Sequence, residues 1–144
     1  MTSKIKDPGL SDQGILKIEW AESRMPVLAS LRKKASKKKP LKGLRIGGCL
    51  HVTKETAVLV RAIRDAGADA AWCGCNPLST QDDVAAALAK EGVSVYAWRG
   101  LSTPDYYWCI RQVLDSKPQL TLDDGADLVF TLHNERQNQL GQII

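Results

Sequence analysis

A histidine and two carboxylates stand where two buried strands of this sequence are expected to end. His51 follows the short apolar run "LRIGGCL", and Asp123 and Asp124 close a later run, "QLTLDD". An imidazole has an ordinary pKa of about 6.5, and an imidazole beside a carboxylate commonly moves protons near neutral pH. The pattern favours acid–base chemistry. Two alternatives remain open at this point: a histidine at a strand end often only bonds a backbone group, and "DDG" is ordinary turn chemistry.

Other residues at predicted strand ends belong to the same candidate site. In an open parallel sheet, ligands bind beyond the carboxyl ends of the strands, because loops and helix N-termini converge there. Besides the histidine and the acids, the residues in such positions are Cys49, Leu50, Cys73 to Asn76, Trp98 and Arg99. If the strands pair in parallel, these side chains share one rim of the sheet with His51 and the acid pair.

The elements that must position these residues alternate between helix and strand. Two N-terminal helices are predicted first, then four strands with helices between them, then one or two final helices. Nearly continuous apolar strands separated by helices are typical of a Rossmann-like, doubly wound α/β fold with a mostly parallel sheet flanked by helices. The predicted helices are 11–24, 26–35, 54–67, 81–92, 105–115 and one or two within 126–144, and the predicted strands are 44–50, 68–74, 93–98 and 119–124.

Basic residues are concentrated just before the first strand. Residues 32–45 contain eight lysines and arginines and no acid, within a chain of net charge +4. The run "RKKASKKKPLK" holds no aromatic residue and lies between a predicted helix and a strand, so a solvated linker is favoured over a nucleic-acid surface. We therefore expect two parts, with N-terminal helices and a basic linker in 1–40 and a partial substrate-binding α/β domain in 41–144.

Several classes of protein are disfavoured by composition and motifs. The longest apolar run is far shorter than the roughly 20 residues that a bilayer crossing needs, and no signal peptide is recognisable, so we expect a soluble, cytoplasmic protein without membrane contacts. The four cysteines read as reduced thiols. The sequence contains neither the dinucleotide motif G-x-G-x-x-G nor the phosphate-loop motif G-x-x-x-x-G-K-[ST]. A zinc site built from His51, Cys73, Cys75 and His133 lacks the usual spacing, and no metal is expected.

Five motifs in unbroken order resemble S-adenosylhomocysteine hydrolase. They are "GCLHVTKETAVLV", "CNPLSTQDDVAAAL", "VYAWRG", "YYWCI" and "LDDGADL", and the resemblance runs from about Lys6 to Leu132 and looks closest to the archaeal and thermophilic branch. It implies a reversible NAD-dependent reaction. The 3′-hydroxyl of S-adenosyl-L-homocysteine is oxidised, C4′ is deprotonated, homocysteine is eliminated, water adds, and reduction releases adenosine.

The resemblance also implies roles for individual residues. His51 matches a histidine that shuttles protons to the leaving thiol and from water, and Asp124 matches a base or relay beside the ribose. Thr53 and Glu55 match residues that hold the adenine, although a helix cap with an acid in its first turn explains the same pair. Leu50, Cys75 and Asn76 are expected to border the substrate without reacting. Asp123 is expected to be structural, and Ala126 replaces the second glycine of the family's "DDGGD".

The resemblance covers only part of the family pattern. The segment "EETTTG" and a glycine-rich NAD domain are not found in this sequence. The expectation is therefore a fragment of the substrate-binding domain that is inactive in isolation. NAD would be bound by a domain absent from this chain, and the family would assemble as a homotetramer mainly through parts not present here. The alternative is a noncatalytic nucleoside-binding or partner-association module.

Overall fold

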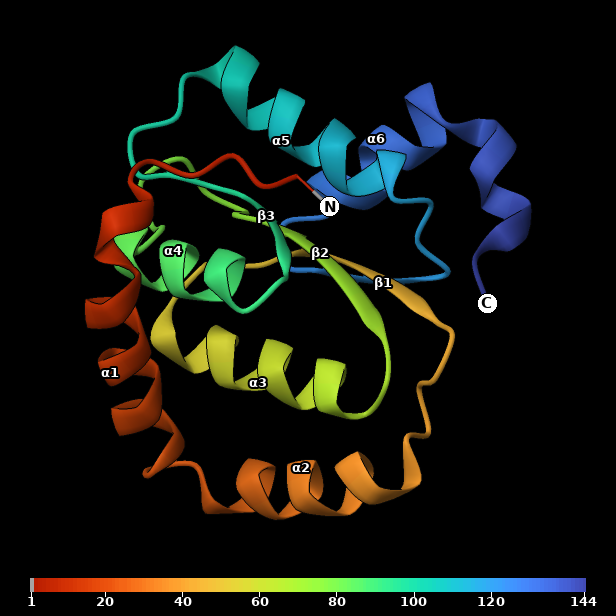
Figure 1. The fold of residues 1–144 in the computed structure, drawn as a ribbon. Coiled ribbons are helices and arrows are strands. Elements are labelled where there is room, and N and C mark those ends of the chain that lie inside the picture. Colours follow the sequence, from red (N-terminus) through yellow and green to blue (C-terminus); the bar gives the residue numbers. More distant parts are fainter. Residues whose placement is uncertain (1) are drawn as a thin grey trace.

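Four parallel strands form the centre of the molecule (Figure 1). The structure, a computed structural model, describes residues 2–144. In the order in which they lie side by side, the strands are β3 (Ser94–Tyr96), β2 (Asp69–Cys73), β1 (Arg45–Cys49) and β4 (Leu120–Asp123). All three strand pairs are parallel. The predicted Rossmann-like α/β fold is confirmed, with a sheet that is parallel throughout.

The order of the strands reverses at β1. The chain runs outward from β1 to β2 to β3 and then returns to place β4 on the other side of β1. Cys49, the last residue of β1, is therefore paired with Cys73 on one side and Asp123 on the other. Such a reversal is where open α/β sheets bind ligands, because the connecting loops diverge to opposite faces there.

Helices cover both faces of the sheet, as a doubly wound fold requires. In Figure 1, α3 and α4 lie on one face, α5 and α6 lie on the other, and α1 and α2 form a further layer outside α3 and α4. Short 3₁₀ helices precede α1 and follow α6. The bounds of the helices are α1 Ser11–Glu22, α2 Pro26–Lys38, α3 Lys54–Asp65, α4 Asp82–Lys90, α5 Thr103–Asp115 and α6 Asp127–Glu135. Within residues 2–144, no helix combines the length and the apolar character that a transmembrane span needs.

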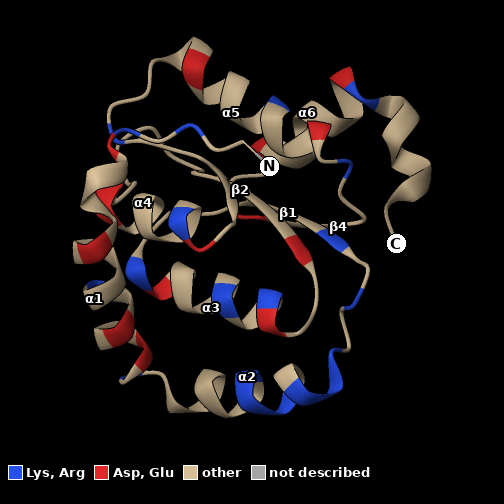
Figure 2. Ribbon diagram, in the orientation of Figure 1, with Lys and Arg blue, Asp and Glu red and all other residues tan. Residues whose placement is uncertain are grey.

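The predicted basic linker is largely helical, which corrects the sequence interpretation. Helix α2 continues through Lys38 and ends at Lys39, which adopts a left-handed backbone with φ of 46° before Pro40. Lysine is a good helix former, and cations in the last turn are favoured by the helix dipole, so the charge run extends the helix. The helix is solvated nonetheless: none of its residues is buried, and Figure 2 shows its basic residues on the outer layer.

The first residues of the chain cover the outer edge of β3, which the sequence did not predict. The backbone N–H of Lys4 donates to the carbonyl of Val95 at 2.9 Å, and Ala97 donates to the carbonyl of Lys4 at 3.2 Å. The Lys4 ammonium lies 4.6 Å from the centre of the Trp108 ring. A sheet edge with free backbone groups invites pairing with other chains, so this segment protects it. The regular part of β3 is reduced to three residues.

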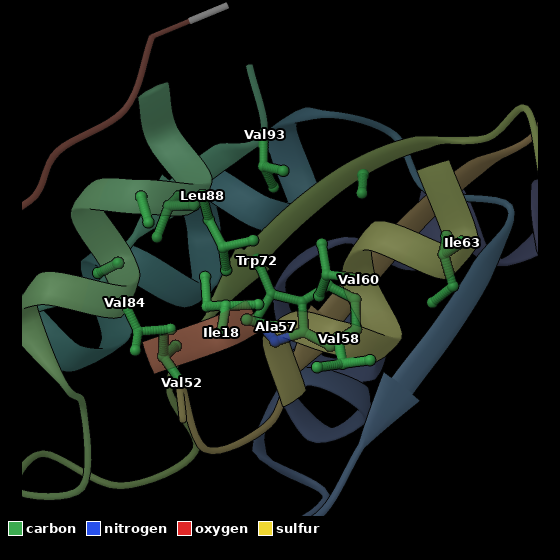
Figure 3. Close-up of a cluster of buried hydrophobic side chains, with 14 of the residues drawn as sticks. Ile18, Val52, Ala57, Val58, Val60, Ile63, Trp72, Val84, Leu88 and Val93 are labelled. Atoms are coloured by element: carbon green, nitrogen blue, oxygen red, sulfur yellow. The ribbon is translucent and has the colours of Figure 1, made fainter. Parts of the chain in front are cut away.

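Two hydrophobic clusters hold the layers together, one on each face of the sheet. The larger cluster joins α1, α3 and α4 to the sheet around Trp72, which is fully buried (Figure 3). Trp72 packs on Gly48 of the neighbouring strand, where an added Cβ would come within 2.4 Å of the indole ring. Ile18 of α1 is fully buried in the same cluster, so the N-terminal helices share the core of the sheet. This packing holds the strands, and with them the residues at their ends, in place.

Candidate active site

Three polar side chains meet where β1, β2 and β4 end. His51 lies two residues after β1, Cys75 two residues after β2, and Asp124 directly after β4. Nε2 of His51 is 3.5 Å from Oδ2 of Asp124, and Sγ of Cys75 is 3.8 Å from the same oxygen. The imidazole and the second carboxylate, which the sequence suggested for one rim, therefore lie side by side at the carboxyl ends of β1 and β4.

Ser79 orients the imidazole from the opposite side. Nδ1 of His51 is 2.6 Å from Oγ of Ser79, which also lies 3.4 Å from the carbonyl oxygen of Asn76. The hydrogen bond at Nδ1 directs Nε2 towards Asp124, because the two ring nitrogens point in different directions. Sequence reasoning missed Ser79. The only available signal was its place in the polar loop "NPLST". The path of that loop past His51 depends on the tertiary structure.

Asn76 shapes the same loop. Its Oδ1 accepts a hydrogen bond from the backbone N–H of Leu78 at 2.8 Å, a local turn that fixes the chain between β2 and Ser79. The Asn76 side chain thus helps to fix the loop that carries Ser79. Leu50, by contrast, packs partly against the larger hydrophobic cluster, and its N–H donates to the carbonyl of Cys73 at 3.2 Å.

Thr53 and Glu55 stand at the first turn of α3, next to His51. Thr53 caps the helix, with Oγ1 accepting from the backbone N–H of Thr56 at 3.5 Å. Glu55 is ion-paired with Lys54 at 3.0 Å, and 52% of its side chain is exposed. Partial burial acts to raise the pKa of Glu55, but hydrogen bonds from Lys54, from its own backbone and from Thr53 outweigh it and lower that pKa. The carboxylate is therefore ionised near neutral pH and accepts hydrogen bonds.

Asp123 has the structural position that the sequence suggested for it. Its Oδ2 accepts a hydrogen bond of 2.9 Å from the N–H of Val129 in the first turn of α6. Its Oδ1 is buried without a hydrogen-bond partner among the described residues. The carboxylate of Asp123 therefore ties the start of α6 to the end of β4, while Asp124, one residue later, is left free to face His51.

The Cys75 thiol is protonated at neutral pH. Burial, together with the neighbouring Cys49 and Asp124, raises the pKa of Cys75 to about 11. The thiolate is the nucleophilic form of cysteine, so this environment suppresses nucleophilic reactivity. The environment supports the expectation that Cys75 borders the site without reacting.

The candidate site is open to solvent. The exposed fractions of the His51 and Asp124 side chains are 45% and 57%. A cavity of about 360 Å³ lies at the opposite end of the strands from His51. Arg45, Asp69 and Ser94, the first residues of β1, β2 and β3, line it. The polar groups able to do chemistry lie at the carboxyl ends of the strands, so that cavity is not part of the candidate site.

The residues at the β1–α3 turn do not fit a dinucleotide. The connection from Leu50 to Thr53 contains no glycine, and the side chain of His51 stands in it. A pyrophosphate needs close backbone approach and free N–H groups at the helix start, whereas Thr53 already accepts from one of them. The β1–α3 turn therefore does not fit NAD.

Comparison with known proteins agrees with this architecture. The sequence pattern of S-adenosyl-L-homocysteine hydrolase matches residues 2–144. An adenosylhomocysteinase of Sulfurisphaera tokodaii is 55% identical over 133 residues, which are 92% of this chain and 32% of that protein. An S-inosyl-L-homocysteine hydrolase of Methanosarcina mazei is 54% identical over 136 residues, covering 94% of this chain and 33% of that protein. A Methanocaldococcus jannaschii protein of the same name is 48% identical over 98% of this chain and 34% of its own length.

This chain thus spans about a third of the length of the curated relatives that it matches. The matched stretch contains every motif on which the resemblance rested, from "GCLHVTKETAVLV" to "LDDGADL". The resemblance stated from these motifs is confirmed: the chain belongs to the S-adenosyl-L-homocysteine hydrolase family.

Proposed function

We propose that this chain forms part of the substrate site of a hydrolase that acts on S-adenosyl-L-homocysteine or a close nucleoside analogue. The observation that carries the proposal is the 3.5 Å approach of His51 and Asp124 at the carboxyl ends of β1 and β4, with Thr53 and Glu55 at the start of the following helix. Family membership indicates the reaction class, because the relatives are named adenosylhomocysteinase and S-inosyl-L-homocysteine hydrolase.

His51 and Asp124 are proposed to handle protons in this reaction. Elimination of homocysteine leaves a thiolate that needs a proton, and the later addition of water needs one removed. The His51 imidazole, held at Nδ1 by Ser79, can give and take this proton at Nε2. Asp124 stabilises the imidazolium that is present before the proton is given to the thiol and again after a proton is taken from water, because an adjacent carboxylate favours the protonated ring.

The base of the nucleoside is proposed to contact the start of α3. The Glu55 carboxylate can accept a hydrogen bond from the amino group of adenine or from N1–H of hypoxanthine, so it suits both kinds of substrate named among the relatives. The Thr53 hydroxyl lies beside it at the helix cap. Leu50, Cys75 and Asn76 are proposed to border the bound nucleoside.

NAD, in this proposal, accepts and returns a hydride when it is bound by a domain outside these residues. The residues of this chain do not fit it, so we assign them only to nucleoside binding and proton transfer. We accordingly propose that the 144-residue chain binds nucleoside without turning it over, and that a homo-oligomer forms through other parts of the family architecture.

Binding of nucleosides to this chain gives the first test. Isothermal titration calorimetry with adenosine and inosine is expected to detect binding that Glu55→Gln weakens by about 10-fold or more, because a hydrogen bond to a charged group contributes about 1.5–3 kcal/mol. His133→Ala is the matched control, since His133 is exposed on α6 and should leave binding unchanged. Absence of binding for both nucleosides would contradict the proposal.

Turnover provides the second part of this test. A polypeptide carrying the remaining part of the Sulfurisphaera tokodaii relative would be added, and release of thiol from S-adenosyl-L-homocysteine followed. His51→Ala is expected to reduce thiol release by at least about 100-fold, the usual effect of losing a general acid–base group. If adenosine binds but the complemented chain releases no thiol, the noncatalytic nucleoside-binding module is the better description.

A further inference from the structure

Three different kinds of metal ligand meet at the strand ends. One imidazole nitrogen of His51, Sγ of Cys75 and a carboxylate oxygen of Asp124 all lie within 4.8 Å of one another. The sequence suggested another combination for zinc, with Cys73 and His133 in place of Asp124, and that combination does not form. Cys73 is buried in the core on the α5 face of the sheet, and His133 lies on the exposed side of α6.

We propose that His51, Cys75 and Asp124 form a binding site for a borderline-soft divalent cation such as Zn²⁺. Three protein ligands with a fourth position open to water are the usual arrangement of an open zinc site. In this arrangement the cation occupies Nε2 of His51 and so withdraws the imidazole from proton transfer. This last consequence rests on the proposed function, whereas cation binding itself does not.

The spacing of the donor atoms suits a tetrahedral ion. With Zn–N and Zn–O bonds of about 2.0 Å and a Zn–S bond of about 2.3 Å, tetrahedral geometry places N and O about 3.3 Å apart and S and O about 3.5 Å apart. The corresponding distances are 3.5 Å from Nε2 of His51 to Oδ2 of Asp124 and 3.8 Å from Sγ of Cys75 to the same oxygen. These two distances are within a few tenths of an ångström of tetrahedral geometry, and the donor atoms of His51 and Cys75 lie within 4.8 Å of each other.

The three ligands lie just after the paired strands of the sheet. They follow three adjacent strands, β2, β1 and β4, whose ends are paired at Cys49. The backbone N–H of Asp124 donates to the carbonyl of Cys49 at 3.2 Å. Ser79 bonds Nδ1 of His51 at 2.6 Å, the outer-shell contact that commonly orients a metal-bound histidine. Preorganised ligands of this kind pay little conformational entropy on binding.

The chemistry of the donors selects the cation. A thiolate and an imidazole favour Zn²⁺ or Co²⁺, whereas Mg²⁺ and Ca²⁺ prefer oxygen ligands alone. A thiolate and a carboxylate together balance the charge of a divalent ion. Although Cys75 is protonated without a cation, a bound metal ion deprotonates a coordinating thiol directly. The exposed sides of His51 and Asp124 leave access for the ion and for a water ligand.

Titration of the chain with Co²⁺ tests the site by its spectrum. Binding is expected to give intense visible ligand-field bands of low-coordinate cobalt and a thiolate-to-cobalt charge-transfer band in the near ultraviolet. Zn²⁺ should abolish both, and Mg²⁺ should not. Cys75→Ser should remove the charge-transfer band, and Asp124→Asn should weaken binding by about 100-fold or more, since even outer-shell losses cost 10- to 100-fold. His133→Ala should leave the spectrum unchanged.

Three results would overturn the cation site: weak bands of octahedral cobalt without a thiolate band, a charge-transfer band that survives in Cys75→Ser, or a spectrum lost in His133→Ala. Circular dichroism of each variant confirms that it is folded. Because cobalt is observed without any nucleoside, failure of the cation site and failure of nucleoside binding give different results. If the chain binds both the cation and the nucleoside, Zn²⁺ is expected to lower the affinity for adenosine, and a chelator is expected to restore it.

Discussion

Ala126 is the residue at which this chain departs from the family motif, and its backbone shows the cost of the departure. It adopts the left-handed conformation, with φ of 66°, immediately before α6. Glycine reaches this conformation without steric strain, whereas a Cβ makes it unfavourable by roughly 1–2 kcal/mol. The second glycine of "DDGGD" therefore has a physical reason, namely the turn that carries the chain from Asp124 into α6.

Replacing Ala126 with glycine is expected to stabilise the protein. Relief of the left-handed strain exceeds the roughly 0.5–1 kcal/mol that the greater freedom of glycine in the unfolded chain costs, so the free energy of unfolding should rise by about 0.5–1 kcal/mol. Urea unfolding followed by circular dichroism measures the difference. Ala29→Gly, within the right-handed helix α2, is the matched control and should lower stability by a similar amount. A loss of stability in Ala126→Gly would contradict this account.

At the scale of the elements, helices α1 and α4 approach each other closely at Gly14. A Cβ built at Gly14 would lie 1.9 Å from the carbonyl oxygen of Asp83 in α4. The ion pair between Lys17 and Asp83 lies one helical turn further along the same contact. This close approach packs α1 against α4 within the larger hydrophobic cluster.

Gly14→Ala is therefore expected to destabilise the chain. Helix propensity alone favours alanine by about 1 kcal/mol, but the clash with the α4 backbone forces the helices apart and should outweigh it, giving a net loss of about 2–3 kcal/mol. Gly141→Ala is the matched control, because no atom lies within 4 Å of its Cβ position, and it should change stability by less than about 0.5 kcal/mol. Equal stabilities of the two variants in urea would rule out the close contact.

At the scale of the whole molecule, burial decreases from the sheet outward. Helix α3 has five buried residues and lies directly on the sheet, whereas α2 lies outside α3 and has no buried residue. Side-chain ion pairs tether α2 to its neighbours, through Arg32 with Glu22 and, at 2.6 Å, with Asp65. Such partly exposed pairs contribute little compared with apolar burial.

Native-state hydrogen exchange is expected to separate these two layers. Amides in α2 should exchange at least about 100-fold faster than those in α3, because local opening of α2 exposes little apolar surface. Exchange followed by mass spectrometry with peptide resolution measures both helices in one sample, so α3 serves as the internal control. Equal protection of α2 and α3 would show instead that the outer layer unfolds only with the core.

Local signals in the sequence were sufficient for the types of element. Apolar runs and capping residues predicted the alternation of strands and helices, and Thr53 does begin α3 as its cap. The basic segment was misread, because charge density argued for a linker while the helix-forming tendency of lysine was given too little weight. The edge pairing of Lys4 with β3 was missed, since strand pairing between distant residues leaves no periodic pattern.

What the sequence determined by itself is the α/β class, the family and the presence of acid–base groups at strand ends, because each depends on residue types and on neighbours close along the chain. Only the tertiary structure decided which of these groups meet. Cys75 and Asp124 are 49 residues apart in the sequence. Sγ of Cys75 nevertheless contacts Oδ2 of Asp124, because β2 and β4 both pair with β1. Ser79 reaches His51 for a similar reason, since the path of a loop is determined by the packing beneath it.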